Sequence, residues 1–180
     1  MKRVLILYGW HGSDAPHWQE WLAKQLKDLD FEVSFPQLSD KMNPTKDVWV
    51  KEAKVVFDQL KPDIVVVHSL GNILWMHLCA LGLVTTVSKL LLVAPPRDLS
   101  DVKEIKSFFP IPKTDNLCAD KILMVASDND PYMNLDEAKS FASQWKLPLK
   151  IVEKAGHINS DSGFGPWPWA LEWVKEKDDS

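Results

Sequence analysis

The sequence has 180 residues, a length typical of one domain that buries a large apolar core without help from disulfides or a metal. Lys and Arg total 21 and Asp and Glu total 25, which leaves a formal net charge of −4. Nucleic acids and anionic membranes attract clustered positive charge, so this balance argues against both as the main partner. No apolar run approaches the roughly 18 residues of a membrane span, and the apolar stretch behind Met1 is too short for a secretory signal. We expect a single domain over residues 1–180 and a cytoplasmic location.

The first half of the chain alternates apolar strands with helices. Residues 64–67 are four apolar residues of which three are valine, a run typical of a buried parallel strand. Pro16 suits the start of a helix, where its missing N–H costs little. In chain order the pattern predicts a strand at 4–8, a helix from about Pro16 to Leu29, a strand at 31–35, a helix at 47–60 and a strand at 64–67.

The second half continues the alternation, with one irregular stretch. Residues 95–119 contain four prolines and no long periodic segment, so any lid there is expected to be small. The pattern predicts a helix at 72–81, strands at 90–94 and 122–126, a helix at 135–145 capped by Asn134, a strand at 149–152 and a helix at about 168–177. This alternation predicts an α/β fold, with an approximately six-stranded parallel sheet, helices on both faces and little or no lid.

Ser69 follows the buried strand at 64–67 and precedes a predicted helix, in the sequence His68-Ser69-Leu70-Gly71. A serine on a tight strand-to-helix turn exposes its hydroxyl beside unpaired helix N–H groups, so one place can hold a nucleophile and stabilise an oxyanion. Gly71 matches the second glycine of the Gly-x-Ser-x-Gly pattern, whereas Val67 stands at the first. The alternative interpretation is that Ser69 only caps the helix.

An acid and a histidine follow two later strands. In an open parallel sheet the active site lies beyond the carboxyl ends of the strands. Asp128 and Asp130 follow the strand at 122–126, and His157 follows the strand at 149–152, which gives the serine–acid–histidine order of α/β-hydrolases. His157 would take the proton of Ser69, and the acid would hold the imidazole in place. Either aspartate could serve, and both the aspartates and His157 could instead be ordinary loop residues.

The remaining site residues come from loops near Ser69. The oxyanion hole is predicted to use the N–H groups of Leu70 and Trp10, the latter in the loop after the first strand. The pocket is predicted to be lined by Trp10, His11, Phe109, Ile111 and Trp167. No metal and no cofactor are expected, because neither the histidines nor the two cysteines, Cys79 and Cys118, have the spacing of a metal site.

Four motifs spread over nearly the whole chain carry a family resemblance. They are Gly12-Ser13 with His17-Trp18-Gln19 and Trp21-Leu22, His68-Ser69-Leu70-Gly71, Ser127-Asp128-Asn129-Asp130-Pro131-Tyr132, and Gly156-His157-Ile158-Asn159 with Ser162-Gly163-Phe164-Gly165-Pro166-Trp167-Pro168. Together they resemble the small α/β-hydrolase-fold serine hydrolases that include retinoblastoma-binding protein 9. The last motif is the most specific of the four. The resemblance implies a compact α/β-hydrolase fold and the catalytic residues Ser69, Asp130 and His157.

The expected function is hydrolysis of small acyl substrates, esters above all and also thioesters or amides, through an acyl-enzyme. The expected partner is a small-molecule acyl substrate, and the chain is expected to be a monomer or a weak homodimer. The retinoblastoma protein is not an expected partner, since neither cysteine lies in a Leu-x-Cys-x-Glu motif. Two alternatives stay open. One is a serine aminopeptidase-like peptidase, and the other is a catalytically vestigial interaction module, which Val67 and the nine tryptophans suggest.

Overall fold

The computed structural model describes residues 1–177, and six parallel strands form its centre. The strands lie in the order β2-β1-β3-β4-β5-β6, and each adjacent pair runs parallel. Their bounds are β1 Arg3–Leu7, β2 Glu32–Ser34, β3 Ile64–His68, β4 Val87–Val93, β5 Ala119–Ser127 and β6 Leu149–Val152. The predicted six-stranded parallel sheet is therefore confirmed.

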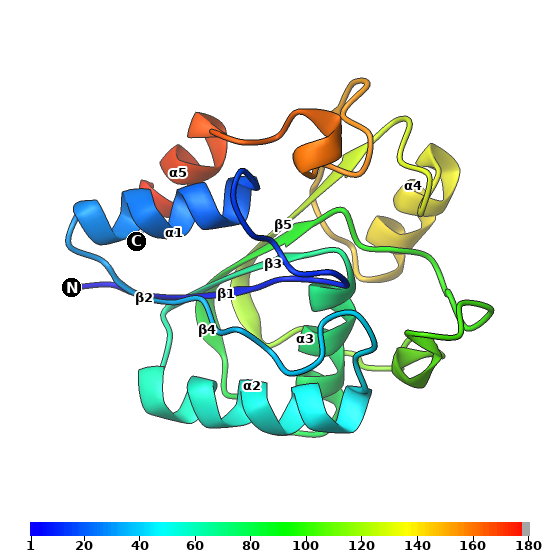
Figure 1. The fold of residues 1–180 in the computed structure, drawn as a ribbon, viewed down its shortest axis with the longest axis horizontal. Helices are drawn as coiled ribbons and strands as arrows, with labels where there is room; N and C mark the ends of the chain where they lie inside the picture. The colour runs from blue at the N-terminus through cyan, green and yellow to red at the C-terminus, as the bar shows by residue number, and fades with distance from the viewer. Residues whose placement is uncertain (178–180) are drawn as a thin grey trace.

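Five helices cover the two faces of this sheet (Figure 1). One face carries α1 (Trp18–Asp28) and α5 (Pro168–Lys175), whose buried tryptophans and leucines pack in one apolar core. The other face carries α2, α3 and α4, which share a second and larger core. Their bounds are α2 Lys46–Leu60, α3 Leu70–Ala80 and α4 Leu135–Gln144.

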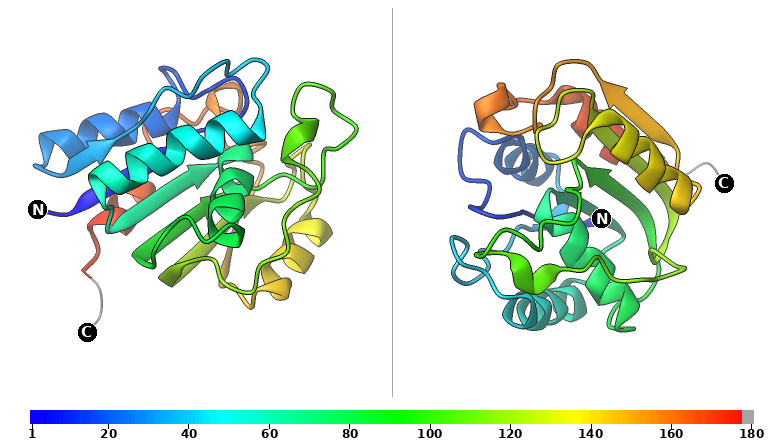
Figure 2. Two further views of the ribbon diagram at one scale, coloured as in Figure 1. Left: turned by 90° about the horizontal axis from the view of Figure 1, so that it is seen from below. Right: turned by 90° about the vertical axis from the view of Figure 1, so that its right-hand side faces the viewer.

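The order of the strands places a crevice between β1 and β3. From β1 the chain passes outward to β2, whereas from β3 onward it continues in the opposite direction across the sheet. Loops that leave neighbouring strands toward opposite sides open a crevice at the carboxyl ends of those strands. Figure 2 (right) views the molecule from this end, where the loops after β1, β3, β5 and β6 gather. Each predicted site residue from Trp10 to His157 belongs to one of those loops or to the adjoining strand and helix ends, apart from Phe109 and Ile111.

The predicted elements differ from the observed ones mainly at their ends. The strand predicted at 90–94 begins at Val87, and the strand predicted at 122–126 begins at Ala119. The helix predicted to reach 177 ends at Lys175, and of the charged tail that follows, residues 178–180 lie outside the described part. The irregular stretch after β4 contains one short 3-10 helix, η1, at Lys106–Phe108.

Helix length and composition bear on membrane insertion. Among the helices of residues 1–177, none is both long and apolar enough to cross a bilayer.

The two cysteines, Cys79 and Cys118, are buried free thiols within the larger core.

Candidate active site

Ser69 occupies a strained turn between β3 and α3. Its backbone has φ 53° and ψ −125°, a conformation that L-residues rarely adopt and that recurs where a functional side chain must be held out of a helix. Ser69 stands at the N-cap position of α3, yet its hydroxyl makes no capping hydrogen bond. The hydroxyl instead lies 2.7 Å from Nε2 of His157. This geometry disfavours the interpretation of Ser69 as a simple helix cap.

Two glycines make room for that turn. A Cβ on Gly71 would lie 2.7 Å from the carbonyl oxygen of Leu7 and 2.8 Å from that of Tyr8, so only glycine fits there. A Cβ on Gly9, in the loop after β1, would lie 2.9 Å from both the Leu70 nitrogen and the Ser69 Cβ. Val67 is fully buried in the sheet, beside Leu7 of β1, and needs no such space. The space that the Ser69 turn needs is therefore left by Gly71 and by Gly9, which lies in the loop after the neighbouring strand β1.

Asn72 fastens the turn from inside α3. Its side-chain amide donates to the carbonyl oxygens of Ser69 and Val93, both at 2.9 Å. The Asn72 backbone N–H also donates to the Ser69 carbonyl, at 2.9 Å. These bonds tie the serine backbone to the end of β4, and they hold the strained conformation in place.

His157 lies between Ser69 and Asp130. Its Nδ1 is 2.9 Å from one Asp130 carboxylate oxygen and 3.0 Å from the other, while its Nε2 meets the serine hydroxyl. Both His157 and Asp130 are buried, and Asp130 also accepts the backbone N–H of Tyr132 at 2.8 Å. With Nδ1–H donating to the carboxylate, Nε2 is free to accept the serine proton, which is the arrangement that nucleophilic catalysis by serine needs.

Asp128 takes a different role from Asp130. Its side chain is exposed and accepts the backbone N–H of Lys154 at 2.7 Å, so it joins the loop after β5 to the loop after β6. Ser127 and Asn129 tie the same loops together, through bonds to the N–H groups of Ala155 and Gly156. Of the two aspartates that the sequence offered, the structure brings Asp130 to the histidine.

Two further histidines, His68 and His17, pack near His157, and their role was not predicted from the sequence. The Nε2 of His68 donates to the carbonyl oxygen of His157, which is 2.9 Å away and far along the chain. The ring of His17 packs edge-on against His68 at 4.8 Å. Burial lowers the pKa of His17 to about 4 and holds the pKa of His68 well below its usual range, so both rings are neutral at pH 7.

The two predicted oxyanion donors are placed near the hydroxyl. Leu70 is the first residue of α3, and Trp10 follows Gly9 in the loop after β1. Both residues line the same cavity as Ser69 and His157. Among the turn, loop and cap hydrogen bonds of residues 1–177, neither backbone N–H has a partner. Both donors therefore have free capacity toward a ligand, as an oxyanion hole requires.

Two small cavities flank Ser69. One, of about 120 Å³, has apolar walls from Pro96, Leu99 and Ile105. The other, of about 170 Å³, has polar walls that include His17 and Asp161. Trp10, His11, Ser69 and His157 border both of them, as do Asn159 and Asp161. Trp10 and His11 therefore line the site as expected.

Three predicted pocket residues do not line either cavity. Phe109 is buried in the larger core, and Ile111 packs against that core. Trp167 lies on the opposite face, where its ring meets that of Trp18 edge-on at 5.0 Å. Phe109 and Trp167 gain more from burial in a core than from a partly wet cleft. Pro96, Leu99 and Ile105, from the same irregular stretch as Phe109, take their place.

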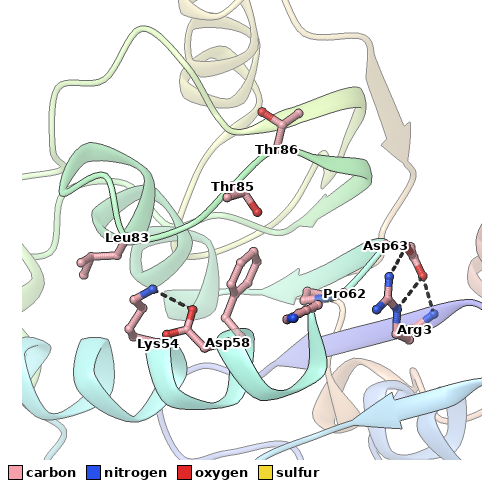
Figure 3. Close-up of a pocket in the computed structure, with 10 residues that line it drawn as sticks. Arg3, Lys54, Asp58, Pro62, Asp63, Leu83, Thr85 and Thr86 are labelled. Atoms are coloured by element: carbon pink, nitrogen blue, oxygen red, sulfur yellow. Dashed lines mark hydrogen bonds and ion pairs between the residues drawn. The ribbon is translucent and has the colours of Figure 1, made fainter.

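A larger cavity lies away from this site. It measures about 540 Å³ and is lined by residues at the opposite end of the strands, as Figure 3 shows. Four of the five charged side chains that line it form two ion pairs. Arg3 contacts Asp63 at 3.0 Å, and Lys54 contacts Asp58 at 2.7 Å. Among the described residues, no serine, cysteine or histidine lines this cavity, so its size alone does not make it a reaction site.

Comparison with known proteins identifies the family. The model of the family described as serine hydrolase matches residues 4–176, almost the whole chain. A search of curated proteins finds no match. The specific likeness to retinoblastoma-binding protein 9 stays a prediction.

Solved structures share the fold. The ydeN gene product from B. subtilis is 21% identical with a TM-score of 0.85, and the match covers 97% of each chain. A YdeN-like hydrolase from Pectobacterium atrosepticum is 26% identical with a TM-score of 0.75, over 96% of this chain and 89% of the other. Est1E from Butyrivibrio proteoclasticus, with ferulic acid bound, is 13% identical with a TM-score of 0.66, over 98% of this chain and 90% of its own.

Proposed function

The chain belongs to the serine hydrolase family, and we propose that it cleaves small acyl esters through a covalent intermediate on Ser69. The observation that carries the proposal is the continuous set of contacts from Ser69 through His157 to Asp130, with the serine in a strained turn that exposes its hydroxyl. A serine hydroxyl is a weak nucleophile at neutral pH, so it needs an adjacent base that is itself held in place.

Acylation follows from this arrangement. The Ser69 oxygen attacks the ester carbonyl carbon while its proton passes to Nε2 of His157. The carbonyl π electrons move onto oxygen, and the N–H groups of Trp10 and Leu70 stabilise that negative charge. When the intermediate collapses, the bond to the alcohol oxygen breaks and His157 returns the proton to the departing alcohol. Asp130 stabilises the imidazolium throughout and stays ionised.

Deacylation repeats these steps with water. His157 takes a proton from a water molecule, whose oxygen attacks the acyl carbon. Collapse of the second intermediate breaks the bond to the Ser69 oxygen, which regains its proton from His157. The products are a carboxylic acid and the free enzyme. No cofactor takes part in the proposed reaction.

The size of the cleft supports small substrates. The two cavities beside Ser69 measure about 120 and 170 Å³, well below the roughly 300–1,000 Å³ typical of sites for drug-sized ligands. We therefore expect short acyl esters to react faster than long-chain lipids. Thioesters and amides can react by the same steps, and we include them in the proposal after esters. A cytoplasmic location and a monomeric or weakly dimeric state remain predictions.

The alternatives receive less support. The interaction-module interpretation rested on Val67 and on the number of tryptophans. Val67 fits within the sheet, and each of the nine tryptophans is buried or half-buried, so the described surface has no exposed tryptophan patch. A peptidase that selects a charged peptide side chain would need a pocket with clustered charges. The described residues of the two cavities contain no such cluster.

Replacing Asp130 by Asn tests the proposed function. An amide keeps the shape of the carboxylate but neither holds the required tautomer nor stabilises the imidazolium. We expect kcat on p-nitrophenyl butyrate to fall by about four orders of magnitude, measured from the rate of nitrophenol release. Asp128→Asn is the matched control and should fall far less. Equal losses in the two variants would contradict the assignment of the acid.

A further inference from the structure

The two cavities beside Ser69 offer different chemistry to the two halves of an ester. The cavity bordered by Pro96, Leu99 and Ile105 is apolar on that side. The second cavity has His17, His68 and Ser160 in its wall instead, and these residues do not border the first. Because the reacting serine borders both cavities, an ester centred on Ser69 would place one half in each.

His17 is the unusual group in the polar cavity. The residue is 4% exposed and caps α1 through Nδ1, which accepts the backbone N–H of Gln19 at 3.1 Å. In a neutral ring whose Nδ1 accepts, Nε2 carries the hydrogen. Within the described residues this buried Nε2 has no hydrogen-bond partner. A buried donor without a partner costs free energy, so an acceptor supplied by a ligand in this cavity would be favoured.

The charges in the wall define which acceptors fit. His17 and His68 are both neutral at pH 7, and no Lys or Arg borders the cavity. Asp161 supplies its one carboxylate. A negatively charged ligand would therefore meet a carboxylate with no lysine or arginine in the described lining to offset it, whereas a hydroxyl or carbonyl oxygen needs only a donor.

We propose that this polar cavity binds the alcohol half of the substrate and that Nε2–H of His17 donates to a neutral oxygen on it. The cavity bordered by Pro96, Leu99 and Ile105 then receives the acyl half. The preferred substrates are short acyl esters of polar, uncharged alcohols that carry a further hydroxyl or carbonyl group. This inference rests on the proposed hydrolase function and adds the class of its leaving group.

Two variants separate the binding role of His17 from its capping role. Asn places an oxygen where Nδ1 lies and is a strong N-cap, but it has nothing at the position of Nε2. Gln places an amide nitrogen near the position of Nε2 but is a poor cap. If His17 binds substrate, Asn should keep the stability of the protein and lose the substrate preference, while Gln should do the reverse. A merely structural residue would lose stability and preference together.

The preference is measured with two esters of the same acyl group, 2,3-dihydroxypropyl butyrate and propyl butyrate. In wild type we expect kcat/KM to favour the dihydroxypropyl ester by about tenfold, the value of one good hydrogen bond. In His17→Asn this ratio should approach one, mainly through KM, and in His17→Gln it should largely survive. Equal rates for both esters in wild type, or an unchanged ratio in His17→Asn, would overturn the proposal.

The same proposal is tested without turnover in Ser69→Ala. The dihydroxypropyl ester should shift the His17 ring-nitrogen signal in NMR titration and bind more tightly than the propyl ester, and adding His17→Asn should remove the difference. If neither ester is hydrolysed by wild type but this binding difference is present, the hydrolase proposal fails and the polar site stands. If hydrolysis occurs and the binding difference is missing, the polar site fails alone.

Discussion

Val67 lies two residues before Ser69, where many hydrolases of this fold carry a small residue. In this chain it is buried within β3, and the close contacts to the serine come instead from Gly9 on the neighbouring segment. The register of β1 and β3 explains why Gly9 takes this position. Leu7 pairs with Val67, and this pairing brings the end of β1 against the turn at Ser69. Room for the turn is supplied across the sheet as well as along the chain.

Val67→Gly should therefore restore the sequence pattern without improving the site. We expect a loss of about 2–4 kcal/mol in the free energy of unfolding, from the lost valine side chain and the added backbone entropy. The rate of labelling by a fluorophosphonate should not rise. Gly9→Ala is the informative comparison, because its Cβ would push on Ser69, and we expect labelling to slow on the order of 100-fold. Faster labelling of Val67→Gly than of wild type would contradict this account.

The order of serine, acid and histidine along the chain predicts that Ser69, His157 and one of two aspartates meet, and only the family resemblance selects Asp130 over Asp128. Each of these residues follows a strand of a parallel sheet, so topology alone brings them to one edge. The pocket walls could not be predicted in the same way, because the path of the 95–118 loop depends on packing that no local pattern records. The role of His17 was missed as well, because the predicted helix began at about Pro16, whereas α1 begins at Trp18 and His17 is its N-cap.

At the scale of elements, strand and helix types were predictable and their ends were not. The predicted strand at 90–94 omits Lys89, and a charged residue is unusual in a buried strand. In the structure its ammonium is buried against the C-terminal end of α5, where it donates to the carbonyl oxygen of Trp173 and lies 4.3 Å from the ring of that residue. Helix C-termini favour cations, so the charge is compatible with burial there.

Helix α4 follows the loop that holds Asp130, and its start is fixed by a capping box. Asn134 accepts the N–H of Glu137 at 2.8 Å, and the Glu137 carboxylate accepts the N–H of Asn134 at 2.8 Å. Asn134→Ala should lower the free energy of unfolding by about 1 kcal/mol, measured by urea denaturation. Thr45, the N-cap of α2, makes no side-chain capping bond, so Thr45→Ala should cost clearly less. A larger loss at Thr45 would be inconsistent with these caps.

At the scale of the whole molecule, the buried histidines couple stability to pH. Burial lowers the pKa of His17 from 6.5 to about 4 in the folded protein, and burial also holds the pKa of His68 well below its usual range. Between pH 6.5 and pH 4 the unfolded chain therefore binds more protons than the folded one. The stability that depends on these neutral rings is fully present above pH 6.5 and is lost as the pH drops toward 4. For His17 alone the loss by pH 5 is about 2 kcal/mol.

Urea denaturation of wild type and His17→Asn at pH 7.5 and pH 5.0 measures this coupling. Asparagine keeps the cap of α1 but does not titrate, so the variant should lose less stability between the two pH values than wild type does. The difference between the two proteins isolates His17 from the carboxylates, which titrate in both. Parallel losses would show that the His17 ring is not held neutral by burial.

The central claim is that Ser69 is a nucleophile activated by His157, and active-site labelling tests it most directly. Wild type, Ser69→Ala and His157→Ala would be treated with a fluorophosphonate, and the modified residue would be located by mass spectrometry of peptides. The account predicts a single adduct on Ser69 in wild type, none in Ser69→Ala and at most slow labelling in His157→Ala. A folded wild-type protein that gives no adduct on Ser69, or an adduct that forms equally fast without His157, would contradict it.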